Sequence, residues 1–378
     1  MNLTDDMLQY IQDTRHETKQ LIRNLCAIPA PSHHEEKRAD FCRKWFLENG
    51  FENVSVDPAL NVLVPVNVKD PADLTVIMAH TDTVFPDISP MSVKEEDGFL
   101  YSPGVTDDTA NLAIMMICAR YIKDHFPEGK RGILFVANSC EEGLGNLKGC
   151  RAVMDVYGAG IKEFITLDSN SMDHLVAEAV GSHRYKITVR TKGGHSFNHF
   201  GAPSAIQKLS AMIVKLYSIR VPCKKNTKTT YNAGMISGGT SVNTIAQQAE
   251  MMYEYRSNDK ECLSWMKKES LEIINSFKTE DVEVSTELLG ERPCGENISP
   301  EKFEPLKNRI KNSAETVLGI KMKEKPGSTD CNIPLSKGIP AICFGVCRGS
   351  GAHTREEKLE LASISDGCRL LLHFLCCS

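Results

Sequence analysis

A set of imidazole and carboxylate side chains in this sequence could bind metal ions together. The residues are His80, Asp107, Asp108, Glu141, Glu142, Asp168 and His353. Imidazole and carboxylate ligands without thiolates are typical of a catalytic site for zinc, manganese or cobalt, whereas structural zinc sites use paired cysteines. The set is large enough for two divalent ions, which together polarise a carbonyl group and activate water. The chemistry that these residues indicate is therefore hydrolysis.

Short apolar runs lead into three of these positions. One run ends at His80, another is followed by Glu141, and a third ends at Asp168. Open parallel sheets bind ligands beyond the carboxyl ends of their strands. We therefore expect these side chains to meet at one edge of a parallel sheet.

Each of these residues also has an ordinary explanation when it is taken alone. An acidic pair at Asp107 is favourable at the start of any helix, Asp168 could cap a turn, and His353 in a glycine-rich loop could simply be exposed. Glu141 and Glu142 are more informative, because adjacent carboxylates after an apolar strand repel each other unless a proton or a cation lies between them. The occurrence of all these groups at strand ends or in adjoining loops favours a metal site.

Strand-like runs alternate with helical patterns in the first part of the chain. Helices are expected over residues 35–49 and 107–125, the second with apolar residues at helical spacing. Ser32 and Glu35 have the spacing of a capping box at the start of the first of these helices. The alternation predicts an α/β fold with a mostly parallel sheet and helices on both faces.

The pattern changes at about Gly181. Residues 181–289 show the order β-α-β-β-α-β, which predicts an inserted ferredoxin-like α+β domain. The alternation of helices and strands seen in the first part of the chain returns over residues 290–378. A chain of 378 residues is also too long for one compact core. We therefore expect a discontinuous catalytic domain, residues 1–180 and 290–378, interrupted by a lid or dimerisation domain.

Composition and charge exclude several classes of protein. The net charge of -5 with both signs mixed gives no footprint for nucleic acid. No apolar stretch is long enough to cross a bilayer, and the first residues are polar and acidic, unlike a signal peptide. Most of the 14 cysteines lie in apolar segments, which fits reduced thiols. We expect a cytoplasmic protein without nucleic-acid or membrane partners.

The order of the motifs resembles that of the dinuclear zinc peptidases. That family includes aminoacylase, glutamate carboxypeptidase, succinyl-diaminopimelate desuccinylase and tripeptide aminopeptidase (peptidase T). The most specific motifs are Ala79-His80-Thr81-Asp82-Thr83-Val84, Cys140-Glu141-Glu142-Gly143 and Gly193-Gly194-His195-Ser196. The segments Ser328-Thr329-Asp330 and Gly338-Ile339-Pro340-Ala341 match later motifs, so the resemblance covers nearly the whole chain.

The resemblance implies a division of the metal ligands between two sites. Asp107 would bridge the two ions. His80 and Asp168 would complete one site, and Glu142 and His353 the other. The cofactors implied are two divalent metal ions, zinc first, with cobalt and manganese as alternatives.

The resemblance also implies roles for residues that do not bind metal. Asp82 would orient His80 by accepting its second N–H, and Glu141 would be the general base. His195 would stabilise the oxyanion, either from the same chain or across a dimer. Asn243 and Arg256 would hold the substrate carboxylate, for which the planar fork of an arginine is suited. A turn residue at His195 and an exposed strand residue at Arg256 are the ordinary alternatives.

Two departures from the peptidase T-like pattern bear on the substrate. Thr109-Ala110-Asn111 stands where that pattern has Lys-Ala-Gly, and Asp168 stands where deacylating and glutamate-releasing members tend to carry Glu. The second departure favours an aminopeptidase. We therefore expect an exopeptidase that acts on di- and tripeptides through a water activated by two metal ions. The alternative is a carboxypeptidase or an N-acyl-amino-acid amidohydrolase of the aminoacylase type. The sequence leaves the oligomeric state open, and a homodimer through the inserted domain is compatible with either activity.

A non-catalytic binding module and a structural zinc protein are weaker interpretations. A binding module would need no base beside its ligands, and a structural zinc site would use paired cysteines. The expected partner is therefore a small peptide or N-acyl amino acid that the enzyme converts.

Overall fold

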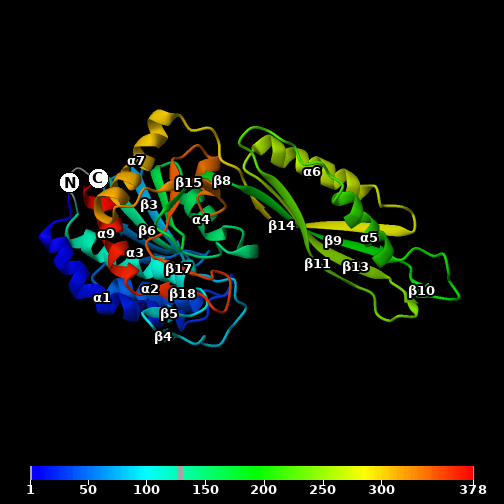
Figure 1. Ribbon diagram of the computed structural model, residues 1–378, viewed down its shortest axis with the longest axis horizontal. Coiled ribbons are helices and arrows are strands. Elements are labelled where there is room, and N and C mark those ends of the chain that lie inside the picture. Colours follow the sequence, from blue (N-terminus) through cyan, green and yellow to red (C-terminus); the bar gives the residue numbers. More distant parts are fainter. Residues whose placement is uncertain (1, 127–130, 378) are drawn as a thin grey trace. The chain divides into compact units, whose positions relative to one another are not determined.

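The computed structural model describes residues 2–126 and 131–377 (Figure 1). The chain forms two compact units, one of residues Met1–Ala179 and Glu296–Ser378 and the other of residues Val180–Gly295. The second junction lies later than the sequence predicted, because the last strand of the smaller unit runs on to Arg292. None of the helices in the described residues is long and apolar enough to cross a lipid bilayer.

An eight-stranded sheet forms the centre of the larger unit, in the order β1-β2-β6-β3-β7-β16-β8-β15. The strands are β1 (Ser55–Val56), β2 (Val62–Val66), β3 (Leu74–His80), β6 (Gly132–Asn138), β7 (Ile161–Leu167), β8 (His174–Ala179), β15 (Lys323–Gly327) and β16 (Ala341–Phe344). The four central strands β6, β3, β7 and β16 are parallel neighbours. Their carboxyl ends therefore lie at one edge, as the apolar runs predicted.

Helices cover both faces of this sheet. They are α1 (Asp5–Cys26), α2 (Glu36–Glu48), α3 (Ala110–Asp124), α4 (Lys148–Tyr157), α7 (Pro300–Leu318), α8 (Asn332–Ser336) and α9 (Ser363–Leu372), with the short turns η1 (Val105–Thr109), η2 (Gly143–Gly145) and η3 (His373–Cys377). Ile77 and Ala79 of β3 pack into one core with α1, α3 and α9, whereas Val76 and Met78 pack into a second core with α4. Successive strand residues point to opposite faces, so β3 is buried on both. The predicted α/β fold is confirmed.

A small antiparallel sheet was not predicted. It contains β4 (Lys94–Glu96), β5 (Phe99–Tyr101), β17 (Gly349–Ser350) and β18 (Lys358–Glu360) in the order β17-β18-β5-β4. These strands have only two or three residues, too few for a recognisable alternation. The loop between β17 and β18 carries His353, so this sheet holds that residue beside the segment that follows β5.

The smaller unit has the predicted ferredoxin-like topology. Its elements are β9 (Gly181–Thr191), β10 (Gly194–His195), α5 (Ala205–Leu216), β11 (Thr229–Gly238), β12 (Thr244–Ile245), β13 (Gln248–Ser257), α6 (Lys260–Asn275) and β14 (Val282–Arg292). The four long strands form an antiparallel sheet in the order β11-β13-β9-β14, and both helices share one core with one face of it. The strands β10 and β12 pair separately.

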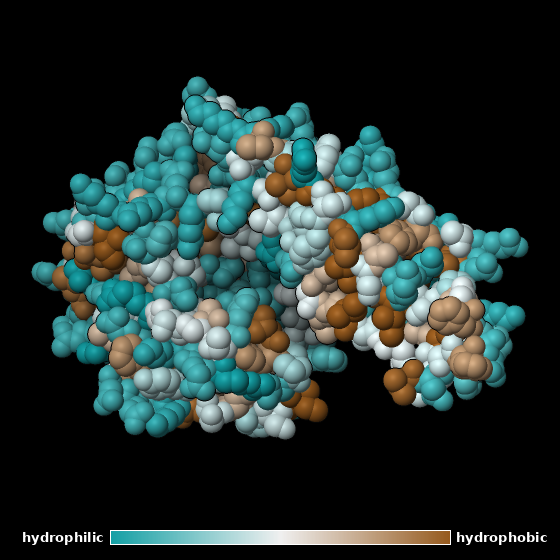
Figure 2. All heavy atoms as spheres, turned by 45° about the vertical axis from the view of Figure 1, so that its right-hand side comes forward, coloured by the Kyte–Doolittle hydropathy of each residue, from teal (hydrophilic) through white to brown (hydrophobic). Residues whose placement is uncertain are grey.

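Exposed apolar side chains are frequent on the smaller unit, where Figure 2 shows them gathered in brown. They include Phe197, Phe200, Ile206, Val214, Tyr217, Met235, Ile236 and Val242. Met235 and Ile236 belong to β11, an edge strand of the sheet, and expose 68% and 59% of their surface. An edge strand with apolar side chains is a surface on which another strand can pair.

Candidate metal centre

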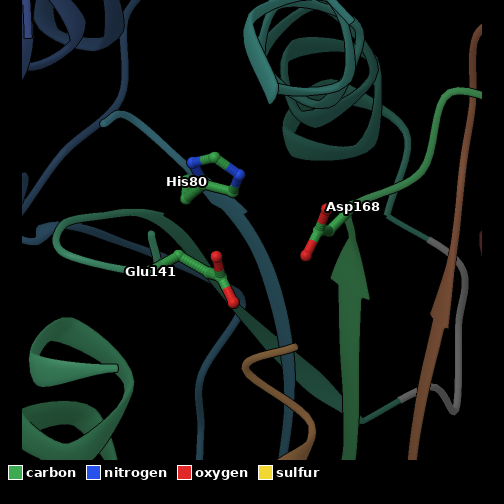
Figure 3. Close-up of side chains that lie close together, drawn as sticks. All are labelled: His80, Glu141 and Asp168. Atoms are coloured by element: carbon green, nitrogen blue, oxygen red, sulfur yellow. The ribbon is translucent and has the colours of Figure 1, made fainter. Parts of the chain in front are cut away.

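The carboxyl ends of β3, β6 and β7 bring together three of the predicted residues. Suitable ligand atoms of His80, Glu141 and Asp168 lie within 4.8 Å of one another, and Figure 3 shows the three side chains turned toward a common space. His80 is the last residue of β3, Asp168 follows β7, and Glu141 lies just beyond β6. Ligand atoms of Asp107 and Glu142 form a second such group with His80.

Asp107 lies between two imidazole rings. Its Oδ1 atom is 3.0 Å from Nε2 of His80, and its Oδ2 atom is 3.0 Å from Nε2 of His353. Nε2 of His353 is also 3.2 Å from Oε1 of Glu142. Each oxygen of Asp107 therefore faces a different histidine, which is the arrangement that a carboxylate needs to bridge two ions.

The helix predicted from Asp107 begins only at Ala110. Asp107 and Asp108 have φ values of -123° and -127°, outside the helical range, and belong to the irregular turn η1. The carboxylate of Asp107 faces the two histidines from this turn. The acidic pair therefore lies before the helix rather than in its first turn.

Burial and crowding make the ionised form unfavourable for two of these carboxylates, Asp168 and Glu142. Burial, followed by the charges of Glu141 and Asp107, raises the pKa of Asp168 well above its usual value. Burial also raises the pKa of Glu142 to about 7, helped by the charges of Asp107 and Glu141. Hydrogen bonds to Asp107 and Glu142 raise the pKa of His353 to about 10. A cluster of this kind is stabilised by positive charge, so its residues fit divalent ions.

Asp82 makes more hydrogen bonds with the backbone of Glu141 and Glu142 than with His80. Its two carboxylate oxygens each accept a 3.0 Å hydrogen bond, from the backbone N–H groups of Glu141 and Glu142. The nearest acceptor for Nδ1 of His80 is the carbonyl oxygen of Asp82 at 3.0 Å, and the carboxylate is 3.4 Å away. Burial opposes ionisation of Asp82, but its hydrogen bonds to His80 and Ser32 outweigh burial and lower its pKa. Asp82 thus connects β3 with the segment after β6.

The capping-box prediction for Ser32 and Glu35 is wrong. The hydroxyl group of Ser32 donates to Oδ2 of Asp82 at 2.6 Å, and the buried carboxyl group of Glu35 accepts from the backbone N–H of Cys140 at 3.0 Å. Both side chains therefore support the segments of Asp82 and Cys140 rather than the start of α2. The local spacing does not reveal these partners, because Asp82 lies 50 positions after Ser32 and Cys140 lies 105 positions after Glu35.

Glu357 is a further supporting residue that the sequence did not reveal. Its buried carboxylate accepts hydrogen bonds from the backbone N–H groups of Gly104 and Thr106 at 2.7 Å and of Asp107 at 3.0 Å. It lies in the same loop as His353, so it ties that loop to η1. A single Glu four residues after a His carries no local signal of this contact.

The predicted residues of the smaller unit do not all lie together. His195 and Asn243 are adjacent, because the backbone N–H of Ser196 donates to the carbonyl oxygen of Asn243 at 3.0 Å. The backbone N–H of Phe197 lies 3.3 Å from Nδ1 of His195. That contact leaves Nε2 of His195 to carry the proton.

Arg256 lies at the other end of the same sheet. It pairs with Ser182 at the start of β9, whereas His195 follows the end of that strand. Its Nε and Nη2 atoms contact the carboxylate of Glu254 at 3.0 and 3.1 Å. A substrate carboxylate would therefore compete with Glu254 for the Nε–Nη2 edge of this arginine.

A parallel sheet with imidazole and carboxylate groups at its carboxyl edge, interrupted by a ferredoxin-like unit, defines a class of metal-dependent hydrolases. The chain belongs to the peptidase family M20/M25/M40, whose family model matches residues 76–376. The family predicted from the motifs is confirmed, and the protein is an enzyme of the peptidase and amidohydrolase type.

Similar proteins agree with this membership. The succinyl-diaminopimelate desuccinylase of Corynebacterium glutamicum is 25% identical over 368 residues, which cover 94% of this chain and 95% of that protein. A tripeptidase from Staphylococcus aureus has a similar fold, with a TM-score of 0.77, 21% identity and coverage of 96% of this chain and 97% of its own. The aminopeptidase PepT from Bacillus cereus gives a TM-score of 0.73 with 22% identity, covering 96% and 98% of the two chains.

Proposed function

We propose that the protein is an exopeptidase that removes amino-terminal residues from di- and tripeptides, with two divalent metal ions at its centre. The observation that carries the proposal is the position of Asp107, with one oxygen 3.0 Å from His80 and the other 3.0 Å from His353. His80 and Asp168 would complete one site, and Glu142 and His353 the other. Zinc suits these ligands, with cobalt and manganese as alternatives.

Two ions bound there would polarise the scissile carbonyl group and make a water molecule acidic enough to ionise near neutral pH. Glu141 would take a proton from the attacking water as its oxygen bonds to the carbonyl carbon, and would pass that proton to the nitrogen of the leaving amine as the C–N bond breaks. Asp82 holds the backbone of Glu141 through a 3.0 Å hydrogen bond, which keeps the base in place between these two transfers. His195, with its proton on Nε2, donates to the developing oxyanion.

Substrate recognition would involve the smaller unit. Asn243 lies beside His195 and offers an amide to the peptide. Arg256 would bind the substrate carboxylate in place of Glu254, since a bidentate contact with one carboxylate can be exchanged for another. Asp168, at a position where deacylating members tend to carry Glu, supports the aminopeptidase reading.

The second candidate is an amidohydrolase that removes an acyl group from an amino acid, or a carboxypeptidase. The Corynebacterium relative, a desuccinylase by name, matches nearly the whole chain. Every metal ligand would keep its role in either reaction. The two candidates differ in which end of the substrate must be free.

A matched set of alanine peptides separates the candidates. The substrates are trialanine, its amino-terminally acetylated form, its carboxyl-terminal amide, and N-succinyl-alanine, assayed with zinc, cobalt or manganese. We expect cleavage of trialanine and of its amide, because both keep a free amino group. Cleavage of acetylated but not amidated trialanine would establish a carboxypeptidase, and rapid hydrolysis of N-succinyl-alanine alone would establish a deacylase. Enzyme stripped of metal by a chelator is the control.

A further inference from the structure

Asn111 lies in the first turn of α3 and is completely buried at the carboxyl edge of the sheet. Its Nδ2 group lies 2.7 Å from Oδ1 of Asp108 and 3.1 Å from the carbonyl oxygens of Thr106 and Ser169. Its Oδ1 atom accepts the backbone N–H of Val346 at 2.8 Å. One side chain therefore reaches three separate segments of the larger unit.

Each of these segments carries or precedes a residue of the metal centre. Thr106 comes immediately before Asp107, and Ser169 immediately after Asp168. Val346 follows β16 and leads into the segment that carries His353.

Asp108 extends the contact to a fourth segment. Its Oδ1 atom accepts a hydrogen bond from Nδ2 of Asn111, and its Oδ2 atom accepts one from the backbone N–H of His80 at 2.9 Å. The amide of Asn111 is thus linked, directly or through one carboxylate, to the segments of His80, Asp107, Asp168 and His353.

The contacts at this position require an amide. Only Asn or Gln can donate two hydrogens and accept one from the same group, and Asn is the shorter of the two. An aspartate would place an acceptor against three oxygens, and an apolar side chain would leave buried carbonyl groups without a donor, at about 1–3 kcal/mol each. A glycine, as in the Lys-Ala-Gly pattern of peptidase T-like sequences, has no side chain for any of these bonds.

We propose that Asn111 is a positioning residue that sets the spacing of the metal ligands in this chain. It binds no ion and no substrate itself. It acts by fixing the backbone on which His80, Asp107 and Asp168 stand, and thereby the distances between their ligand atoms. This inference rests on the proposed metal centre, but it concerns ion binding and not the choice of substrate.

The first test measures metal affinity without relying on activity. Cobalt and zinc are titrated into metal-free Asn111→Ala in competition with a chromophoric chelator, and the visible spectrum of bound cobalt is recorded. We expect a 10–100-fold loss of affinity at one or both sites and an altered cobalt spectrum, as is usual when a partner of metal ligands is removed. The control is Ser313→Ala, because Ser313 is also buried but bonds to Arg309 and His373, away from these segments. Affinities within twofold of the wild type would overturn the proposal.

A reciprocal exchange keeps the test decisive if Asn111→Ala does not fold. In the double variant Asp108→Asn/Asn111→Asp, the amide and the carboxylate change places. The contact between the two side chains and the acceptors for His80 N–H and Val346 N–H remain, and only the carbonyl oxygens of Thr106 and Ser169 lose their donor, as they also do in Asn111→Asp. We expect it to bind cobalt more tightly than Asn111→Asp alone. Equal or weaker binding by the double variant would overturn the proposal. If the wild type binds two ions but cleaves no peptide, the proposed function fails while this inference stands.

Discussion

Glu141 and Glu142 are neighbours in the chain but have different surroundings. An oxygen of Glu142 lies 3.2 Å from His353, whereas Glu141 shares its group with His80 and Asp168. Both are held through their backbone N–H groups by the same residue, Asp82. The same substitution at each of the two positions can therefore distinguish the proposed base, Glu141, from the proposed metal ligand, Glu142.

We expect Glu141→Gln to retain its metal and to lose about 10²–10⁴-fold in kcat, because the amide cannot accept the proton of the attacking water. Glu142→Gln is the matched control, and we expect its metal content to fall below that of the wild type. Metal content by mass spectrometry and kcat are measured on the same preparations. Loss of metal from Glu141→Gln would make Glu141 a ligand, and near-normal turnover would remove it from the role of base.

The pKa of Glu142 predicts how metal binding depends on pH. Burial raises this pKa from 4.5 to about 7, so below pH 7 the carboxyl group is protonated and an ion must displace the proton. The slope of log affinity against pH should therefore increase by about one decade per pH unit as the pH falls through 7. Isothermal titration of cobalt between pH 5.5 and 8.5, repeated with Glu142→Gln, measures this. A slope that does not change near pH 7 would contradict the assignment.

The residue types that gather at the candidate metal centre could be predicted from the sequence, but the residues that support them could not. His80 and Asp168 follow apolar runs that are recognisable as strands, so residue type and position sufficed. Glu357 contacts Thr106 from 251 positions away, and it does so through backbone N–H groups that have no sequence signature. Ser32 belongs to a local pattern that predicts a helix cap, but its hydroxyl group contacts Asp82 instead.

Elements were predictable where burial imposes a pattern. The fully buried β3 and β6 appear as continuous apolar runs, as expected for parallel strands covered on both faces. The strand β15 was missed because its sequence, Lys-Glu-Lys-Pro-Gly, is exposed at the edge of the sheet and shows no alternation. Pro65 of β2 pairs with Leu134 of β6, and β1 pairs only with Val62 and Leu63. Among the described residues the outer side of Pro65 has no partner strand, which suits a residue without an N–H donor.

A substitution in the edge strand β11 tests whether the protein forms a homodimer through this strand. Ile236 exposes 59% of its surface on this strand, and we expect Ile236→Lys to shift a dimer toward monomer, since a buried charge at an interface is costly. Val156→Lys, at an apolar position on α4 that is 74% exposed, is the control and should leave the mass unchanged. Light scattering over a range of concentrations measures the mass. A wild type that is monomeric at every concentration would exclude the dimer.

The length of β9 bears on whether one chain can complete its own site. Arg256 lies at one end of this strand and His195 beyond the other, roughly 30 Å apart at about 3.3 Å per residue. A di- or tripeptide is too short to contact both residues from the same unit. We therefore expect His195 and Arg256 to be supplied to one substrate by two different chains.

Mixing two inactive variants tests this expectation. We predict that Glu141→Ala and His195→Ala, unfolded and refolded together, recover up to roughly a quarter of the wild-type activity, because half of the dimers are mixed and one of their two sites is intact. Each variant refolded alone is the control. If the mixture stays as inactive as its parts, His195 acts within its own chain.

The order in which the larger unit is assembled along the chain has a consequence during synthesis. The strand β16 lies between β7 and β8 in the sheet, but it is translated only after the whole smaller unit. A nascent chain on the ribosome can fold the smaller unit while the sheet still lacks an inner strand, and His353 emerges later still. Premature termination anywhere before residue 341 would therefore yield a polypeptide with an open gap in its sheet, exposed to proteases and unable to mature into an enzyme.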